Sequence, residues 1–187
     1  MQKLVHTTRL DWAGSTGEGY RVYSRAHDAS APPAEAALRL SADPHFRGDA
    51  ALLNPEQLVV LAASSCQLLA FLSLAARRHL DVVRYTDDAT GHLSADLRRA
   101  RIELIELTPV IDVTPGTDEA MVLALVEQAH EECYIANSLT SAVTISATVR
   151  TGPRRVRSSA DASEDLLVRG TRPRGVQVAH GCPRRSP

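Results

Sequence analysis

The sequence of 187 residues has few cysteines, few aromatic residues and almost no net charge. Three cysteines are too few for the disulfide framework of a domain of this size. With one Trp, four Tyr and two Phe, the core must consist mostly of Leu, Val, Ile and Ala. The N-terminus lacks the apolar run and the small-residue cleavage site of a signal peptide. We therefore expect a cytoplasmic protein, where a neighbouring cysteine pair is more often redox-active or metal-bound than structural.

The net charge of −1 conceals two segments of opposite charge. Residues 150–187 contain nine Arg and three acidic residues, a net charge of +6, so residues 1–149 carry −7. We predict one domain over residues 1–149 and a largely disordered basic tail over residues 150–187, because so few aliphatic side chains cannot offset the entropy of ordering. The tail has no Lys and no aromatic residue, so we interpret it as an extension rather than a nucleic-acid-binding arm, and Cys182 as an incidental exposed thiol.

The hydrophobic pattern predicts an α+β domain without βαβ units or a phosphate-binding glycine loop. One helix is expected from Asn54-Pro55, a favourable N-cap and first-turn pair, to about His79. A second helix is expected from Thr117 or Asp118, with apolar residues at helical spacing up to position 136. Strands are expected at residues 5–12, 20–26, 37–41, 82–86, 101–107, 110–113 and 142–149, with turns at 14–19, 90–91 and 109.

Residues 58–76 are nineteen consecutive uncharged positions, enough to raise the question of a membrane span. Three serines, a cysteine and a glutamine interrupt this run, and no second such segment follows. Because the segment is apolar nearly all round, we interpret it as a buried central helix and expect no membrane insertion.

Cys66 and Cys133 each lie in one of the two predicted helices. Either cysteine alone could be a small buried hydrophobe, since free cysteine is among the most buried residue types. Both helices are expected in the core, however, so folding could bring the two sulfurs together as a dithiol that cycles through a disulfide. The reactive form of such a thiol is the thiolate, which is only about 3% of a thiol with a pKa of about 8.5 at pH 7.

An arginine is the natural partner for a thiol that attacks a peroxide. Lowering the thiol pKa to about 5 raises the thiolate fraction only about 30-fold, so larger rate gains need a group that positions the peroxide and stabilises the leaving oxygen. Arginine stays charged and presents a rigid fork of donors. Arg47 and Arg25 are the candidates, and the residues alone leave the choice between them open.

Glu56 lies at the start of the first predicted helix and has two possible roles. It could simply complement the helix dipole, or it could hold an arginine fork by a bidentate pair. Ten residues of helix rise about 15 Å, so Glu56 and Cys66 of one regular helix cannot share a compact site. Either the helix is interrupted, or Glu56 acts at the site of a partner chain, an arrangement that two antiparallel copies of this helix would allow.

His130 lies three residues before Cys133, which raises the question of a metal site. Only Glu131 and Glu132 accompany the pair, and the chain has no Cys-x-x-Cys motif. We therefore predict neither a metal nor a cofactor.

The segments around both cysteines resemble the OsmC/Ohr family, named for osmotically inducible protein C and organic hydroperoxide resistance protein. Asn54-Pro-Glu56 followed by Cys66 is similar to the first active-site helix of the family, and residues 130–138, with the sequence His-Glu-Glu-Cys-Tyr-Ile-Ala-Asn-Ser, to the second. Many members have Pro after the second cysteine, where this chain has Tyr134. The resemblance covers residues 8–149, and the stretches 23–27, 43–49 and 85–91 are similar to an OsmC-like subgroup.

This resemblance implies an intertwined homodimer, with two long helices packed between curved antiparallel sheets and each site where the subunits meet. It implies the reduction of organic hydroperoxides to alcohols, with Cys66 as the peroxidatic thiolate and Cys133 as the resolving thiol. Glu56 would orient an arginine, for which Arg47 is the first choice because it precedes the Asn-Pro-Glu motif. The resulting disulfide would be reduced by an external dithiol of dihydrolipoyl or thioredoxin type. The alternative is a non-catalytic ligand-binding or redox-sensing module on the same fold.

Overall fold

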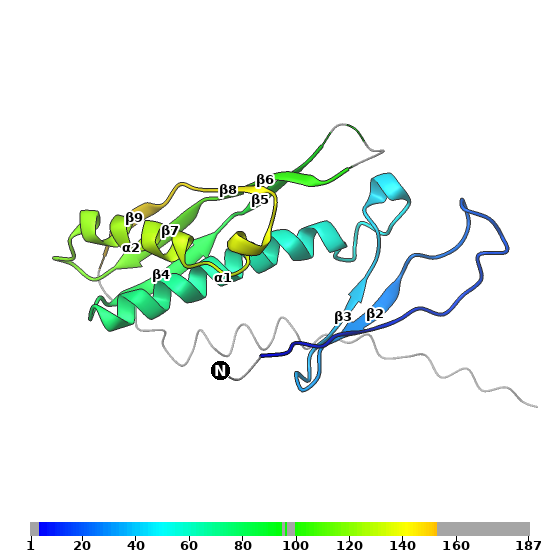
Figure 1. The fold of residues 1–187 in the computed structure, drawn as a ribbon, viewed down its shortest axis with the longest axis horizontal. Helices are drawn as coiled ribbons and strands as arrows, with labels where there is room; N and C mark the ends of the chain where they lie inside the picture. Colours follow the sequence, from blue (N-terminus) through cyan, green and yellow to red (C-terminus); the bar gives the residue numbers. More distant parts are fainter. Residues whose placement is uncertain (1–3, 95, 97–99, 153–187) are drawn as a thin grey trace, which may run out of the picture. The chain divides into compact units, whose positions relative to one another are not determined.

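The computed structural model describes residues 4–94, 96 and 100–152, which fold as an α+β unit (Figure 1). The predicted basic tail beyond residue 152, including Cys182, lies outside the described residues. The elements are β1 (Arg9–Asp11), β2 (His27–Ser30), β3 (Ala37–Leu40), η1 (Pro44–Phe46), α1 (Pro55–Arg77), β4 (Val82–Asp87), β5 (Thr90–Leu93), β6 (Ile102–Leu107), β7 (Pro109–Val113), α2 (Glu119–Glu131), η3 (Ala136–Ser138), β8 (Ala142–Ile145) and β9 (Thr148–Thr151).

The strands form three small sheets, two of which are halves of one bent surface. The first sheet is antiparallel, with the order β1-β2-β3. The other two have the orders β4-β7-β9 and β5-β6-β8, and each combines an antiparallel pair with a parallel one. Because β4 continues into β5, β6 into β7 and β8 into β9 across one or two residues, the two sheets bend along a common line (Figure 1). The parallel pairs arise because α2 crosses over between β7 and β8.

The N-termini of both helices are capped as the sequence predicts. The Asn54 side chain accepts a hydrogen bond from the backbone N–H of Gln57, and the Gln57 side chain accepts one from the N–H of Asn54, which completes a capping box. Asp118 caps α2 by accepting from the N–H of Ala120. The start of α1 is therefore fixed, and with it the position of every side chain along the helix.

The core lies where α1 and α2 pack on each other and on the bent sheet. Gly91 in β5 allows α1 to come close, because a Cβ at this position would lie 2.4 Å from Cγ2 of Val60. The main buried cluster contains Phe71, Leu74, Ala75, Leu80, Ile111, Val113, Val122, Leu125, Val126 and Ala129, and a second cluster contains Ala63, Ile105 and Leu107.

Three predicted elements differ from the structure. Residues 20–26 are turn and coil rather than a strand, and β2 begins only at His27, because Tyr20 and Tyr23 pack edge-on in a small aromatic cluster instead of pairing in a sheet. Residues 90–91 belong to β5 rather than to a turn, and the predicted strand 142–149 is two strands, β8 and β9. Residues 20–26 and 142–149 both alternate as strands do, but tertiary packing decides which of these residues form a strand.

The second helix also ends earlier than predicted. α2 stops at Glu131, so Cys133 lies in the turn that follows it. The Asn137 side chain donates to the carbonyl oxygen of Glu131, and the Ser138 hydroxyl donates to that of Tyr134. These side chains satisfy carbonyl groups that a longer helix would have used, which ends the helix before the cysteine.

One face of α1 is apolar and exposed in the single chain. The prediction of a helix buried all round is wrong for the described residues, since only 28% of its most apolar window is buried. Leu61 is 56% exposed, Leu69 64% and Leu72 38%, and they lie on one side of the helix. By length and composition α1 could cross a membrane, a criterion that the core helix of a soluble protein also meets.

Candidate functional site

The structure brings the two predicted cysteines into contact. Cys66 projects from the middle of α1 and is partly exposed, whereas Cys133 is 1% exposed in the turn after α2. The two thiols lie close enough for Cys66 to raise the pKa of Cys133, and both are free. The pairing predicted from the sequence is thus present as a reduced dithiol, with one sulfur toward the surface and the other enclosed.

The environment of Cys133 keeps its thiol protonated. Burial raises the pKa of Cys133 above its ordinary value, and the neighbouring Cys66 thiol adds to this increase. The N–H of Ala136, whose nitrogen lies 3.5 Å from the sulfur, lowers the pKa in part. A protonated, enclosed thiol is a poor first nucleophile but can supply the proton and the sulfur for a second step.

A glutamine joins the two helices beside the thiol pair. Gln67 is 1% exposed, and its Nε2 donates to the carbonyl oxygen of Val126 in α2 at 3.0 Å. Its Oε1 has no hydrogen-bond partner among the described residues, and neither does the buried Nδ1 of His130. From the sequence alone, Gln67 is only a polar interruption of an apolar run. The missed signal was a long polar side chain on the inward face of a core helix.

A second group of predicted residues meets at a cavity of about 580 Å³ near the start of α1, where Arg25 and Glu56 both contribute to the wall. The Arg25 guanidinium carbon lies 4.2 Å from the ring centroid of Tyr23 and 4.9 Å from that of Tyr20. Its nitrogens donate to the carbonyl oxygens of the same two tyrosines. The wall is completed by Leu10, Trp12, Thr16, Tyr23, His27, Ala42, Asp43, Phe46 and Pro55.

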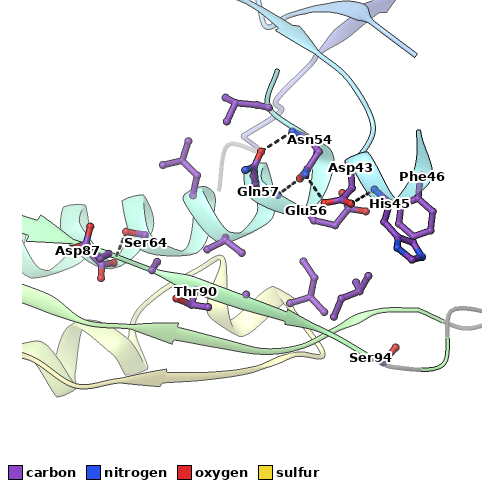
Figure 2. A pocket seen from close by; sticks show the side chains of 18 residues that line it. Asp43, His45, Phe46, Asn54, Glu56, Gln57, Ser64, Asp87, Thr90 and Ser94 are labelled. Atoms are coloured by element: carbon purple, nitrogen blue, oxygen red, sulfur yellow. Dashed lines mark hydrogen bonds between the residues drawn. The ribbon is translucent and has the colours of Figure 1, made fainter. Parts of the chain in front are cut away.

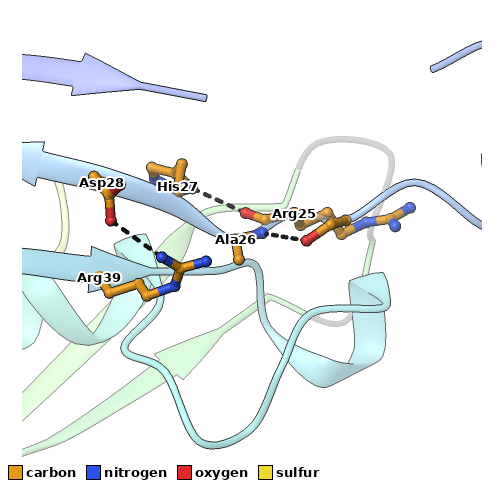
Figure 3. A network of polar contacts seen from close by, with 6 residues as sticks. Arg25, Ala26, His27, Asp28 and Arg39 are labelled. Atoms are coloured by element: carbon orange, nitrogen blue, oxygen red, sulfur yellow. Dashed lines mark hydrogen bonds and ion pairs between the residues drawn. The ribbon is translucent and has the colours of Figure 1, made fainter. Parts of the chain in front are cut away.

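The backbone of Arg25 is held where β2 begins. The Nδ1 of His27 is hydrogen-bonded to the carbonyl oxygen of Arg25, and the N–H of Ala26 donates to the Ser24 hydroxyl (Figure 3). One strand residue further on, Asp28 pairs with Arg39 of β3 at 3.6 Å. Stacked and anchored in this way, the Arg25 side chain is restrained before any ligand arrives.

Glu56 provides a carboxylate oxygen that is buried and has no partner among the described residues, Oε2. The residue lies in the first turn of α1, next to Asn54 and Asp43 (Figure 2). An unpaired buried carboxylate oxygen is costly unless a donor reaches it, which suits a residue that receives an arginine or a ligand.

Arg47, the first choice from the sequence, lies elsewhere. It is exposed, it ends the 3-10 helix η1 with φ of 66°, and its guanidinium carbon lies 6.0 Å from the Tyr20 ring centroid. It is not among the residues that line the cavity of Arg25 and Glu56. The geometry groups Arg25, rather than Arg47, with the predicted glutamate.

A larger cavity of about 860 Å³ lies between α1, β5 and the segment 43–46 (Figure 2). Its wall includes a hydrogen bond from the Ser64 hydroxyl to Asp87, whose other oxygen accepts from the N–H of Thr108. Neither cysteine lines this cavity or the smaller one. Among the described residues, no group of three or more His, Cys, Asp or Glu side chains could hold a metal ion.

The structure therefore forms two pairs and leaves them apart. Cys66 lies beside Cys133, and Glu56 lines one cavity with Arg25, but α1 runs without interruption between Glu56 and Cys66. Ten residues of helix separate the two pairs by about 15 Å, as the sequence predicts. A single chain thus presents two separate groups of candidate residues.

Comparisons with known proteins identify what this arrangement is similar to. The family model described as OsmC-like protein matches residues 48–148. An OsmC-like protein of unknown function from Vibrio cholerae is 29% identical, with a TM-score of 0.70 over 78% of this chain and 100% of that chain. No curated protein matches the chain.

Two solved structures with lower identity show the same fold. An organic hydroperoxide resistance protein OsmC from Legionella pneumophila is 20% identical, with a TM-score of 0.53 over 79% of this chain and 98% of that chain. The organic hydroperoxide resistance protein OhrB of Bacillus subtilis is 17% identical, with a TM-score of 0.52 over the same shares of the two chains.

Proposed function

The chain belongs to the OsmC-like protein family, and on this premise we propose that it is a thiol-dependent peroxidase that reduces organic hydroperoxides to alcohols. The observation that carries the proposal is the contact between the partly exposed Cys66 and the enclosed, protonated Cys133. An accessible sulfur beside a shielded one matches the two roles that a peroxidatic and a resolving thiol need. Two solved structures of the same fold carry names that refer to organic hydroperoxide resistance.

The reaction takes place in two steps. The Cys66 thiolate attacks the O–O bond, takes one oxygen as a sulfenic acid, and releases the alkoxide, which leaves as the alcohol after protonation. The Cys133 sulfur then attacks the Cys66 sulfur, the S–O bond breaks, and the hydroxyl leaves as water with the Cys133 proton. An external dithiol of dihydrolipoyl or thioredoxin type reduces the disulfide by exchange. We place the reaction in the cytoplasm, where such dithiols are kept reduced.

Arg25 is the arginine that we assign to this reaction. Its guanidinium is restrained by Tyr20 and Tyr23, and it shares a cavity with Glu56, whose Oε2 lacks a partner. The fork can stabilise the negative charge that develops on the leaving oxygen, while the aromatic wall receives the organic part of the peroxide. Arg47 does not line the cavity that Arg25 and Glu56 share.

A second copy of the chain completes the site in this proposal. The exposed leucines of α1 form an apolar face that water would otherwise cover, which favours an interface with an equal partner. In an antiparallel arrangement of two α1 helices, the Arg25–Glu56 end of one copy approaches the Cys66 of the other. The homodimer thus explains both the exposed face of α1 and the distance between the two groups of candidate residues, Cys66 with Cys133 and Arg25 with Glu56.

Intact-mass measurement tests the peroxidase chemistry directly. After one equivalent of cumene hydroperoxide, the mass of the reduced protein is expected to fall by two hydrogens, because Cys66 and Cys133 close to a disulfide through a sulfenate. The Cys133→Ser protein serves as the control and is expected to gain one oxygen instead. An unchanged mass in both proteins would instead support the ligand-binding or sensing alternative.

A charge on the exposed face of α1 tests the homodimer. Leu69→Glu is expected to raise the dimer dissociation constant at least about 30-fold, because it places an unpaired carboxylate in an apolar interface. Analytical ultracentrifugation and peroxide turnover measured over a dilution series would show dissociation and loss of activity together. The matched control is Leu123→Glu, since Leu123 is 37% exposed on α2. Equal sedimentation of the two variants would contradict this interface.

A further inference from the structure

Gln67 is the only fully buried long polar side chain on α1 among the residues that the structure describes. A Leu or Met would fill the same space without the cost of taking an amide out of water. The amide makes one of the four hydrogen bonds that it could make, since Nε2 donates one and Oε1 accepts none among those residues. Such a costly residue next to Cys66 calls for a reason beyond filling the core.

The hydrogen bond of Gln67 links the two parts of the chain that carry the thiols. Its acceptor, the carbonyl of Val126, lies seven residues before Cys133, which is about two turns of α2. Beyond the end of α2 the chain continues through short-range bonds, in which the N–H of Cys133 donates to the carbonyl of His130 at 3.2 Å. The placement of Cys133 therefore depends on where the last two turns of α2 lie relative to α1.

Against α1, those last two turns are otherwise held by apolar side chains, which impose no direction. The contact between the helices is apolar, through Val122, Val126 and Ala129 of α2 and Phe71 and Leu74 of α1. Apolar packing tolerates small shifts, whereas a hydrogen bond fixes a distance and an angle. Gln67 thus supplies the directional restraint between the helices at the level of the thiol pair.

We propose that Gln67 is a positioning residue for the resolving step: its hydrogen bond to Val126 holds the end of α2 so that Cys133 closes on the Cys66 sulfenic acid. The inference rests on the proposed peroxidase function and adds to it. In this step the S–S bond forms, the S–O bond of Cys66 breaks, and the departing hydroxyl leaves as water with the proton of Cys133. Gln67 acts through the geometry of α2 and does not touch the peroxide.

Gln67→Met tests this role, because Met keeps the length of the side chain and removes the amide. Attack of Cys66 on cumene hydroperoxide is expected to keep its rate, while disulfide closure slows by about 3- to 10-fold, the range that the net contribution of one hydrogen bond covers. Rapid quenching with a 1,3-diketone that traps sulfenic acid, followed by intact-mass measurement, gives both rates. A larger share of trapped sulfenate at early times is the expected signature.

Gln128→Met is the matched control. The Gln128 side chain also donates a hydrogen bond from Nε2, but to Glu132 on the same helix at 2.9 Å, so its loss leaves the link between the helices intact. Closure in this variant is expected at the wild-type rate. Gln67→Asn keeps the amide but shortens it by one methylene, and it is expected to accumulate sulfenate even if the Met variant does not fold.

The outcomes separate this inference from the proposed function. A purely structural Gln67 would lower the melting temperature in both Gln67 variants and leave the ratio of trapped sulfenate to disulfide unchanged, which would overturn the positioning role. Equal slowing of closure in Gln128→Met would overturn it as well. If the wild-type protein itself formed neither sulfenate nor disulfide, the peroxidase function would fail and this inference with it.

Discussion

Replacing Cys66 with Ser is expected to lower kcat/KM for an organic hydroperoxide by about 1000-fold or more. The thiolate is the nucleophile, and a hydroxyl at the same position is neither ionised at neutral pH nor reactive toward the O–O bond. The expected loss is large because Cys133, the other cysteine among the described residues, is 1% exposed and has a pKa raised by burial, so it is a poor replacement for Cys66. Turnover of cumene or tert-butyl hydroperoxide with dihydrolipoamide as reductant measures the effect.

Cys133→Ser provides the comparison, because it affects only the second step. This variant is expected to consume one equivalent of peroxide and then stop at the sulfenic acid. A common loss of folding cannot produce this difference between the two variants, and circular dichroism of both provides a check. Undiminished turnover in Cys66→Ser would exclude Cys66 as the attacking residue.

Arg25→Ala is expected to reduce kcat/KM by about 100-fold, the scale of losing one preorganised donor to a developing oxyanion. Arg25→Lys restores the charge without the fork and is expected to recover only part of this loss. Steady-state peroxide consumption at several hydroperoxide concentrations gives kcat and KM separately. The reduction is expected mainly in kcat, because the charge that we propose Arg25 stabilises develops in the transition state.

Arg47→Gly is the control suited to the backbone of this segment. Arg47 has φ of 66°, a conformation that favours glycine, so the substitution removes the side chain without adding strain. Its activity is expected to stay close to that of the wild-type protein. The opposite ranking of the two variants would return the catalytic role to Arg47, the first choice from the sequence.

Local signals in the sequence predicted α1 better than any other element. Asn54 and Pro55 mark its start, and the uncharged run that follows predicts a long helix. The structure confirms this helix. The sequence could not show that this helix keeps one apolar face exposed in the single chain, because hydrophobic residues look alike whether their own chain or a partner covers them. The strand predicted over residues 20–26 is wrong, because the aromatic side chains of this alternating segment stack on Arg25 instead of facing a core.

The thiol pair was accessible to prediction, and the arginine was not. Two cysteines on core helices suffice to suggest contact, and the structure shows it. Arg25 and Arg47 both precede the Asn-Pro-Glu motif in the sequence, and only the fold reveals which one shares a cavity with Glu56. The role of Gln67 could not be predicted, because a polar residue in an apolar run indicates only an interruption of that run until its hydrogen-bond partner on α2 is known.

Peroxides oxidise sulfur in stages, and the stages beyond sulfenic acid are not reversed by dithiols. In the proposed reaction, Cys66 is exposed to this over-oxidation whenever a second peroxide arrives before the disulfide closes. Cys133 is not, because its sulfur is almost entirely enclosed. If the chain is the peroxidase that we propose, the resolving thiol is shielded from the oxidant that the attacking thiol meets. The ratio of the closure rate to the peroxide concentration then sets how many turnovers one molecule completes before permanent inactivation.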